Sequence, residues 1–267
     1  MARSNRPYFK SWVKRQPDPG WPLLPLIHIT KAINALDIAH DGELSPSHCD
    51  VMNDALLYFF YGRPGYRVRG DGPVKIEATC PICFVLDSAL LEKAEEILPF
   101  DSGAYHNRMY KSHFIEEMGM KDFSIAGDAI LPNQLISKLF GNRVSYYEGN
   151  TSSIPPIDTI AKPGDLHARA YIELVTSAGR NEPDDRVCSI EVLLRDKVNL
   201  KHHLKAMIVP HTLFNDEYSA EWLLPLQQIG VEVLTYEFHP NKGPDHYSAL
   251  LGLELRRYLR ENNLLET

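Results

Sequence analysis

Short apolar runs of the kind that form β-strands recur along the chain, and they constrain its fold more than any other feature. They lie at residues 23–29, 55–61, 80–86, 186–194, 206–210 and 231–238. Helical patterns separate some of these runs, but strands and helices do not alternate as regularly as in a doubly wound parallel sheet. The sequence also lacks the G-x-G-x-x-G, P-loop and G-x-S-x-G motifs. The pattern therefore predicts an α+β fold with a split or mixed sheet.

The composition is that of an ordinary globular protein, since 44% of the 267 residues are hydrophobic and 24% are charged. This length allows one large domain or two small ones. The four cysteines are too few for a disulfide framework and favour reduced thiols. No apolar segment approaches the roughly 18 residues that a membrane span needs, and the N-terminus lacks the apolar core of a signal peptide. We therefore expect a soluble, cytoplasmic protein.

The formal net charge of −7 argues against a general nucleic-acid binder, because phosphate neutralisation requires a basic excess. An exception is the basic N-terminal arm, residues 1–21, which suits phosphate contact and base stacking. Basic and aromatic residues interleave near its start, namely Arg3, Arg6, Tyr8, Phe9, Lys10, Trp12, Lys14 and Arg15. A solvated tail that its aromatic side chains pin to the domain is the alternative, and we favour it.

Residues 22–267 are expected to form a single domain with a mostly helical insertion at about 100–150. Thr30 is expected to cap a helix that ends at Gly42, because glycine suits the left-handed conformation after a helix. Residues 88–98 have a helical period, and the proline-rich residues 149–166 are predicted to form a loop. Residues 245–262 predict an amphipathic helix.

Cys80 and Cys83 have the C-x-x-C spacing of zinc ligands, for which Cys49, His48 or Cys188 would have to complete the set. Only one such pair occurs. The run FVL that follows is typical of a buried strand, in which cysteine behaves as a small hydrophobic residue. We therefore predict no metal site.

Three polar residues occupy unusual positions. His28 lies in the middle of an apolar strand, and Arg63 lies in a glycine-containing loop between Tyr61 and Tyr66. Glu191 lies in the apolar strand RVCSIEVLL, where an ionised carboxylate is unfavourable unless it is paired or faces a site. Taken singly, His28 is typical of a histidine in the core, Arg63 of a solvated arginine, and Glu191 of a glutamate on the solvent face of an edge strand. Their order along a mixed chain instead suggests one common site.

The motifs around these residues are IHIT at 27–30, DGEL at 41–44, LYFFYGRP at 57–64, PICFVL at 81–86, RVCSIEVL at 186–193 and IVP at 208–210. In this order the chain resembles the ADP-ribosyltransferase superfamily, and most of all its DarT-type branch, which modifies nucleic acid. The resemblance covers roughly residues 22–90 and 185–211. Residues 100–185 carry no such motif, and we expect them to hold the loop that selects the acceptor.

The resemblance implies an ADP-ribosyltransferase-like split sheet with flanking helices and NAD as the substrate, without a metal. It implies that Glu191 stabilises the positive charge that develops on the ribose as the nicotinamide bond breaks. Arg63 would neutralise phosphate or polarise the acceptor, and His28 would bind a ribose hydroxyl or the diphosphate. The other expected NAD contacts are Thr30, Asn34, Tyr58, Tyr61 and Tyr66.

The same resemblance favours transfer of ADP-ribose to a nucleic-acid base, in DNA or RNA, in a toxin or phage-defence role. An antitoxin or a macrodomain hydrolase would then be a partner. The enzymatic alternatives are a protein acceptor and plain hydrolysis of NAD. Alternatives of another class are a non-catalytic interaction or NAD-binding module and an unrelated α+β interaction protein.

Overall fold

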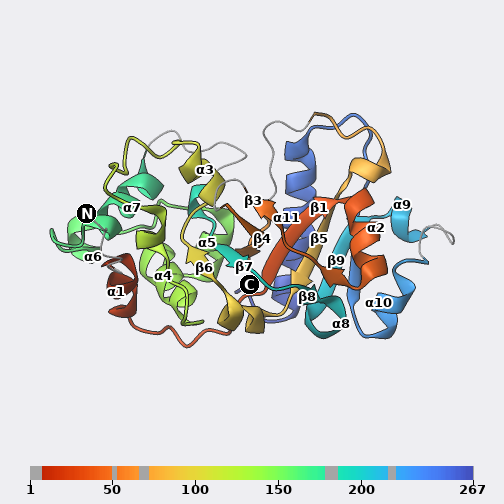
Figure 1. The fold of residues 1–267 in the computed structure, drawn as a ribbon, viewed down its shortest axis with the longest axis horizontal. Helices are drawn as coiled ribbons and strands as arrows, with labels where there is room; N and C mark the ends of the chain where they lie inside the picture. The colour runs from red at the N-terminus through yellow and green to blue at the C-terminus, as the bar shows by residue number, and fades with distance from the viewer. Residues whose placement is uncertain (1–7, 50–52, 66–71, 178–185, 216–220, 267) are drawn as a thin grey trace.

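The computed structural model describes every residue except 1–7, 50–52, 66–71, 178–185, 216–220 and 267 (Figure 1). Its centre is a mixed sheet with the strand order β10-β9-β5-β1-β4-β7-β6, and β3 pairs with β4. Neighbouring strands are antiparallel, apart from the parallel pair of β9 and β10. Strands β2 and β8 form a separate antiparallel pair. The prediction of a mixed sheet is confirmed.

The strands are short and come from both ends of the chain. They are β1 (Leu26–Lys31), β2 (Glu43–Leu44), β3 (Ser47–Cys49), β4 (Asp54–Tyr61), β5 (Pro81–Leu86), β6 (Glu96–Leu98), β7 (Glu191–Leu194), β8 (Val198–Asn199), β9 (Leu204–Pro210) and β10 (Glu232–Tyr236). All six residues of β5 are buried. A strand with both faces covered is expected to be apolar throughout, which explains the run PICFVL.

The helices between the strands are mostly short. They are α1 (Tyr8–Lys14), α2 (Ala32–Asp41), α3 (Ser102–His106), α4 (Leu131–Phe140), α5 (Arg143–Glu148), α6 (Ile157–Ile160), α7 (Leu166–Thr176), α8 (Leu200–His203), α9 (Thr212–Asn215), α10 (Leu224–Gln228) and α11 (Pro244–Glu261). Short 3₁₀ helices add η1 (Glu77–Thr79), η2 (Ser88–Lys93), η3 (Met120–Phe123) and η4 (Arg186–Cys188). In the described part of the chain, no helix is both long and apolar enough to cross a membrane.

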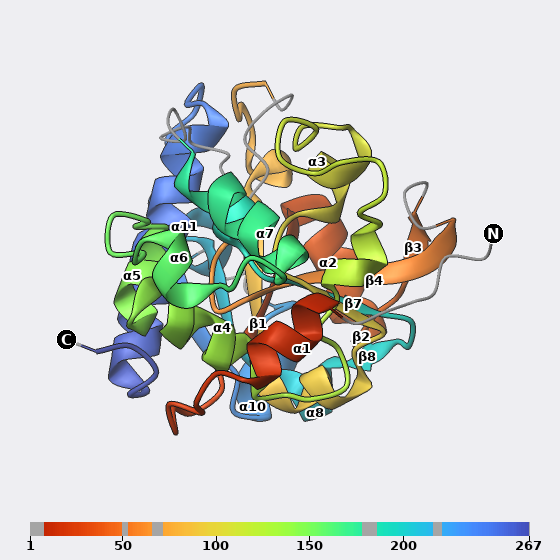
Figure 2. The same cartoon turned by 90° about the vertical axis from the view of Figure 1, so that its left-hand side faces the viewer.

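The helices fall into two groups around the sheet. Helices α1, α4, α6 and α7 gather at one end of the molecule, on the left of Figure 1 and toward the viewer in Figure 2. Helix α2 packs against β1 and β5, and α11 packs against β9 and β10. The predicted helical insertion at 100–150 contains α3, η3, α4 and α5, which cover the β6 and β7 side.

The prediction for the first helix is partly correct. Gly42 follows α2 with φ +70°, and its N–H donates to the carbonyl of Ile38, as the helix C-terminus requires. The prediction that Thr30 caps this helix is wrong, because β1 continues to Lys31 and Thr30 belongs to the strand. Its hydroxyl instead accepts a hydrogen bond from the side chain of Asn34 at 3.1 Å.

The helical period at residues 88–98 does not produce an α-helix. Residues Ser88–Lys93 form the 3₁₀ helix η2, and Glu96–Leu98 form the strand β6 at the edge of the sheet. Pairing of β6 with β7 satisfies the backbone there, so tertiary structure overrides the local pattern.

The N-terminal segment is a docked helix rather than a free arm. Phe9, Trp12 and Val13 are buried in the main core, and the Trp12 indole donates to the carbonyl of Ile160 at 3.1 Å. Buried rings cannot stack on the bases of a bound nucleic acid. The alternative of a segment pinned by its aromatic side chains therefore describes residues 8–14, while Arg3 and Arg6 lie outside the described residues.

Trp12→Ala is expected to lower the free energy of unfolding by about 3–5 kcal/mol, because it removes a 1% exposed indole and its hydrogen bond. Tyr8→Ala on the same helix is the control and should cost little, since Tyr8 is 48% exposed. Urea denaturation monitored by circular dichroism measures both. Equal stability of the two variants would contradict the docking of α1.

Candidate functional site

The sheet opens between β1 and β4. Within the described residues, only two pairs join these strands, Leu26 with Tyr61 and Ile27 with Phe60. Beyond them, β1 pairs with β5 alone, while β4 pairs with β7 and β3. At the opening, His28 Nδ1 lies 2.9 Å from the carbonyl oxygen of Tyr58. The His28 side chain thus occupies the position where the next backbone hydrogen bond between β1 and β4 would form.

A pocket of about 320 Å³ lies at this opening. Strand β1, helix α2, the following loop and β4 supply its walls. Its lining residues are His28, Thr30, Asn34, Asp37, Ile38, Asp41, Glu43, Leu44, Ser45, Ser47, Leu56, Leu57 and Tyr58. Four of the predicted NAD contacts, His28, Thr30, Asn34 and Tyr58, are therefore brought together here.

The protonation state of His28 follows from its contact. Burial lowers the pKa of His28 below its usual range, although the hydrogen bond to the Tyr58 backbone opposes this effect. A carbonyl oxygen can only accept, so Nδ1 carries the proton in the neutral ring. Nε2 is then left as an acceptor, which suits a hydroxyl group of a ligand.

The charge of the pocket restricts what it can bind. Asp37, Asp41 and Glu43 are among its walls, and the described lining contains neither lysine nor arginine. Lys197 forms an ion pair with Glu43 from outside this set. Carboxylates repel a phosphate and attract hydroxyl, amide and cationic groups. The pocket therefore suits a ribose or a pyridinium ring better than a diphosphate.

Glu191 lies outside this pocket. It begins β7, pairs with Phe60 of β4 and Leu98 of β6, and is 3% exposed. The backbone N–H of Ser102, the first residue of α3, donates to Glu191 Oε2 at 3.0 Å. The carboxyl group thus lies beneath α3.

The surroundings of Glu191 favour its neutral form. Burial raises the pKa of Glu191 to about 8, and the nearby carboxylate of Asp101 adds to the shift. The Ser102 hydrogen bonds and the positive charge of Arg186 act in the opposite direction. Arg186 pairs with Asp101 at 2.6 Å, and its guanidinium carbon lies 6.0 Å from the centroid of the Phe60 ring. Glu191 therefore shares an enclosed polar cluster with two charged groups.

Strand alternation separates Glu191 from His28. Directly paired residues share a face of a sheet, and successive residues alternate between faces. Glu191 thus shares a face with Phe60 and Ile27, and His28 belongs to the other face. The described residues do not bring His28 and Glu191 into one pocket, although the two strands are separated only by β4.

Arg63 follows β4 at the end away from the opening. Its guanidinium carbon lies 5.5 Å from the centroid of the Tyr146 ring, and its Nη1 is buried without a hydrogen-bond partner among the described residues. It does not line the pocket of His28. A guanidinium with an unused buried donor retains capacity for an anion.

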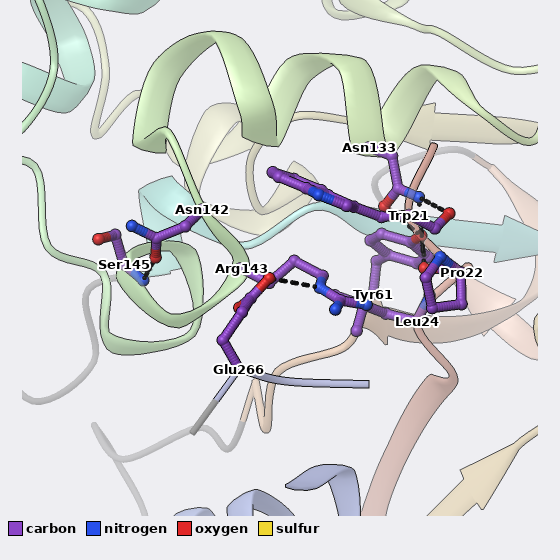
Figure 3. Close-up of polar contacts among 9 residues, drawn as sticks. All are labelled: Trp21, Pro22, Leu24, Tyr61, Asn133, Asn142, Arg143, Ser145 and Glu266. Carbon is purple, nitrogen blue, oxygen red and sulfur yellow. Dashed lines mark hydrogen bonds and ion pairs between the residues drawn. The ribbon is translucent and has the colours of Figure 1, made fainter. Parts of the chain in front are cut away.

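Tyr61 is part of the core rather than a ligand platform. It is fully buried, and its hydroxyl accepts from the N–H of Leu24 and donates to Asn133 Oδ1, both at 2.9 Å (Figure 3). Burial raises the pKa of Tyr61 well above its usual range. The prediction that Tyr61 stacks on NAD is therefore not compatible with this position. Tyr66 lies outside the described residues.

A second and larger pocket, of about 860 Å³, is formed by α3 and the segment after it. Aromatic, basic and acidic side chains line it, namely Tyr105, His106, Arg108, Tyr110, Lys111, Phe114, Ile115, Glu116 and Glu117. The lining begins three residues after Ser102, whose N–H contacts Glu191. One short helix therefore connects the buried carboxyl group to this pocket.

The cysteines have the character of core residues. Cys80, Cys83 and Cys188 are buried and form no disulfide within the described part of the chain, to which the side chain of Cys49 does not belong. Burial raises the pKa of Cys80 to about 11 and that of Cys83 further, which disfavours the thiolate that binds zinc. Among the residues described, no group of three or more His, Cys, Asp or Glu side chains is placed to hold a metal.

Sequence reasoning missed several residues of the Glu191 cluster. Asp101 and Ser102 lie in the segment that carried no motif, and Tyr146 lies in the same segment. Arg186 was present in the strand motif, but nothing in the pattern indicated that it would pair with Asp101. Contacts between residues 85 or more positions apart leave no local signal.

Comparison of the chain with protein families, with curated proteins and with solved structures finds no match.

Because the pKa of Glu191 is raised in the folded chain, the free energy of unfolding should depend on pH. Between about pH 4.5, its ordinary value, and pH 8, the folded chain holds a proton that the unfolded chain has lost. The free energy of unfolding should therefore fall as the pH rises through this window, by at most about 1.4 kcal/mol per pH unit from this group. Urea denaturation at pH 5 and pH 8 measures the slope.

Glu191→Gln should remove this part of the slope, because glutamine does not titrate. Glu96→Gln is a matched control, since Glu96 is also a buried carboxyl residue on the same face of the neighbouring strand β6. The control should retain the Glu191 contribution. A wild-type slope that Glu191→Gln leaves unchanged would contradict the assignment.

Proposed function

We propose that the protein is an NAD-dependent ADP-ribosyltransferase with an ADP-ribosyltransferase-like split sheet. The observation that carries the proposal is the pocket at the opening between β1 and β4, where His28, Thr30 and Asn34 meet. The strand order β7-β4-β1-β5 supports it, because it places the Glu191 strand two positions from the His28 strand. The two strands lie about 10 Å apart in the sheet, but Glu191 and His28 project from opposite faces, so one NAD molecule contacts both side chains only after a local rearrangement.

In the proposed reaction, the bond between C1′ of the ribose and the nicotinamide nitrogen breaks, and nicotinamide leaves with the electron pair. A nucleophilic atom of the acceptor forms a new bond to C1′ and loses its proton to Glu191 or to solvent. Ionised Glu191 stabilises the positive charge on the ribose. Neutral His28 accepts a hydrogen bond from a ribose hydroxyl through Nε2, and Arg63 neutralises phosphate.

This chemistry sets two requirements for Glu191. It must lose the proton that its buried surroundings favour, and the α3 segment must expose it, because Ser102 covers its carboxyl group. Bound NAD carries a positive charge on its nicotinamide ring, which would stabilise the ionised form. Activity is therefore expected to rise with pH up to about 8.

Glu191→Gln should lower kcat by about 100-fold or more, because the neutral amide cannot stabilise the ribose cation. His28→Ala should chiefly raise KM for NAD, by about tenfold, through loss of one hydrogen bond. Release of nicotinamide from labelled NAD measures both. Glu96→Gln should leave both constants unchanged. If Glu191→Gln and wild type release nicotinamide at the same rate, the catalytic assignment is wrong.

The larger pocket is the proposed acceptor site, and its aromatic and basic side chains support a nucleic-acid base as acceptor. Tyr105 supplies a ring surface, and Arg108 and Lys111 supply positive charge. When the chain is incubated with labelled NAD, nucleic acid and protein, label found only in protein would indicate a protein acceptor. Label that appears only as free ADP-ribose would indicate NAD hydrolysis.

The double variant Arg108→Ala, Lys111→Ala is expected to reduce transfer to single-stranded DNA or RNA about tenfold at physiological salt, because two phosphate contacts are lost. Hydrolysis of NAD without acceptor should stay unchanged. The pair Lys75→Ala, Lys201→Ala is the control, since both lysines are exposed and lie outside both pockets. Equal transfer by the two double variants would exclude this pocket as the acceptor site.

A second candidate function is NAD binding without turnover. The burial of Glu191 and its bond to Ser102 favour this reading, because a retired carboxyl group needs no access to ligand. NAD affinity that depends on His28, with no release of nicotinamide, would support it.

A toxin or phage-defence role, with an antitoxin or a macrodomain hydrolase as partner, rests on the resemblance in sequence. Expression of the wild-type chain should slow growth, and Glu191→Gln should relieve the effect. If cells that express either form grow as fast as cells that express neither, the toxin role is contradicted.

A further inference from the structure

Arg63 is held by two residues of the helical insertion. Its guanidinium lies over the ring of Tyr146 in α5, at 5.5 Å from the centroid. It also lies against Gly149, which ends α5 with φ +64°. A Cβ atom at Gly149 would be 3.1 Å from Arg63 Nη2, so glycine suits the left-handed backbone conformation and leaves room for the guanidinium.

The hydroxyl of the same Tyr146 joins the ends of two strands. It donates to the carbonyl of Tyr61, the last residue of β4, at 2.7 Å, and it accepts from the N–H of Ile190 at 3.2 Å. The N–H of Tyr61 donates to the carbonyl of Ile190 at 2.9 Å. Tyr146 thus replaces one of the two backbone bonds that this residue pair would exchange. The next pair is Phe60 with Glu191.

Helix α5 is fixed firmly enough to act as a support. Asn142 accepts from the N–H of Ser145 at 2.7 Å as its N-cap, and Arg143 pairs with Glu266 at 3.1 Å, as Figure 3 shows. Tyr147 donates to the carbonyl of Gly252 in α11. Tyr146 itself is fully buried. Its ring and hydroxyl therefore have little freedom to move.

We infer that Tyr146 is a positioning residue that sets Arg63 and Glu191 relative to each other. The ring orients Arg63, and the hydroxyl fixes the backbone of Ile190, directly before Glu191. The expected effect on catalysis rests on the proposed function, whereas the contacts of Tyr146 do not depend on NAD. The two roles are separable, because one belongs to the ring and the other to the hydroxyl.

Tyr146→Phe keeps the ring over Arg63 and removes both hydroxyl bonds. We expect kcat for nicotinamide release to fall about fivefold to tenfold, with KM for NAD within twofold of wild type, and the rise of kcat with pH to shift by at least about half a unit. Gly149→Ala instead places a Cβ atom 3.1 Å from Arg63 Nη2, which shifts the guanidinium by a few tenths of an ångström, and is expected to raise KM with a smaller change in kcat.

Tyr236→Phe is the control for a merely structural loss. Tyr236 is also buried, and its hydroxyl donates to the carbonyl of Pro81 at 2.8 Å on another strand. Tyr236→Phe should lose similar stability but keep the kcat and the pH profile of wild type. If Tyr146→Phe and Tyr236→Phe show the same kinetics per folded molecule, the positioning role is overturned.

A measurement without NAD separates this inference from the proposed function. The pH dependence of unfolding that Glu191 contributes, facing Asp101 and Arg186, is compared in wild type, Tyr146→Phe and Tyr236→Phe, each with and without Glu191→Gln. The inference is supported if the midpoint pH of the Glu191 contribution to unfolding shifts in Tyr146→Phe and not in Tyr236→Phe. If that shift occurs but no nicotinamide is released, only the proposed function fails. If the chain releases nicotinamide, but Tyr146→Phe changes neither the midpoint pH of the Glu191 contribution to unfolding nor the kinetics of release, the inference is overturned and the proposed function stands.

Discussion

Within the described residues, β1 and β4 pair at only two positions, Leu26 with Tyr61 and Ile27 with Phe60, and His28, Arg63 and Glu191 lie around this short seam. On one side of it the strands part, and His28 bonds to the carbonyl of Tyr58 where a further backbone pair would stand. At the other end, the N–H of Gly62 donates to the carbonyl of Pro25, and Tyr146 enters between Tyr61 and Ile190 of the neighbouring β4–β7 pair. Buried backbone groups must find partners, so the Tyr58 carbonyl at the opening, and the Tyr61 carbonyl and Ile190 N–H between β4 and β7, are satisfied by side chains. The pocket lies at the opening, and Arg63, whose guanidinium lies over the Tyr146 ring, lies near the other end.

The carboxyl group of Glu191 lies next to the seam, on the face that Phe60 and Ile27 share. Burial and the Asp101 carboxylate favour its proton, while Arg186 and the Ser102 N–H favour its charge. A group balanced between two protonation states near neutral pH is suited to acid–base or electrostatic catalysis. The same balance also fits a satisfied core residue. The N–H of Ser102, the first residue of α3, covers one oxygen of this carboxyl group.

Much of the fold could be predicted from local patterns. The runs that became β1, β4, β5, β7, β9 and β10 are apolar segments of strand length, and Gly42 ends α2 as its conformational freedom predicts. Local pattern failed at residues 88–98, where pairing with β7 outweighed a helical period. It also failed at Tyr61, whose aromatic ring suggested a ligand platform, but whose hydroxyl bonds to Leu24 and Asn133 inside the core.

The sequence by itself determined the longer strands of the sheet and which residues are chemically unusual, because period and composition are local properties. It singled out His28, Arg63 and Glu191 as polar groups in apolar or glycine-bounded settings. Tertiary structure alone decided that His28, Thr30 and Asn34 share a pocket, that Glu191 lies on the other face with Asp101 and Arg186, and that Tyr146 supports Arg63. The reason is physical. Side chains alternate with period two along a strand, so the pairing register and the covering helices set the neighbours of each residue.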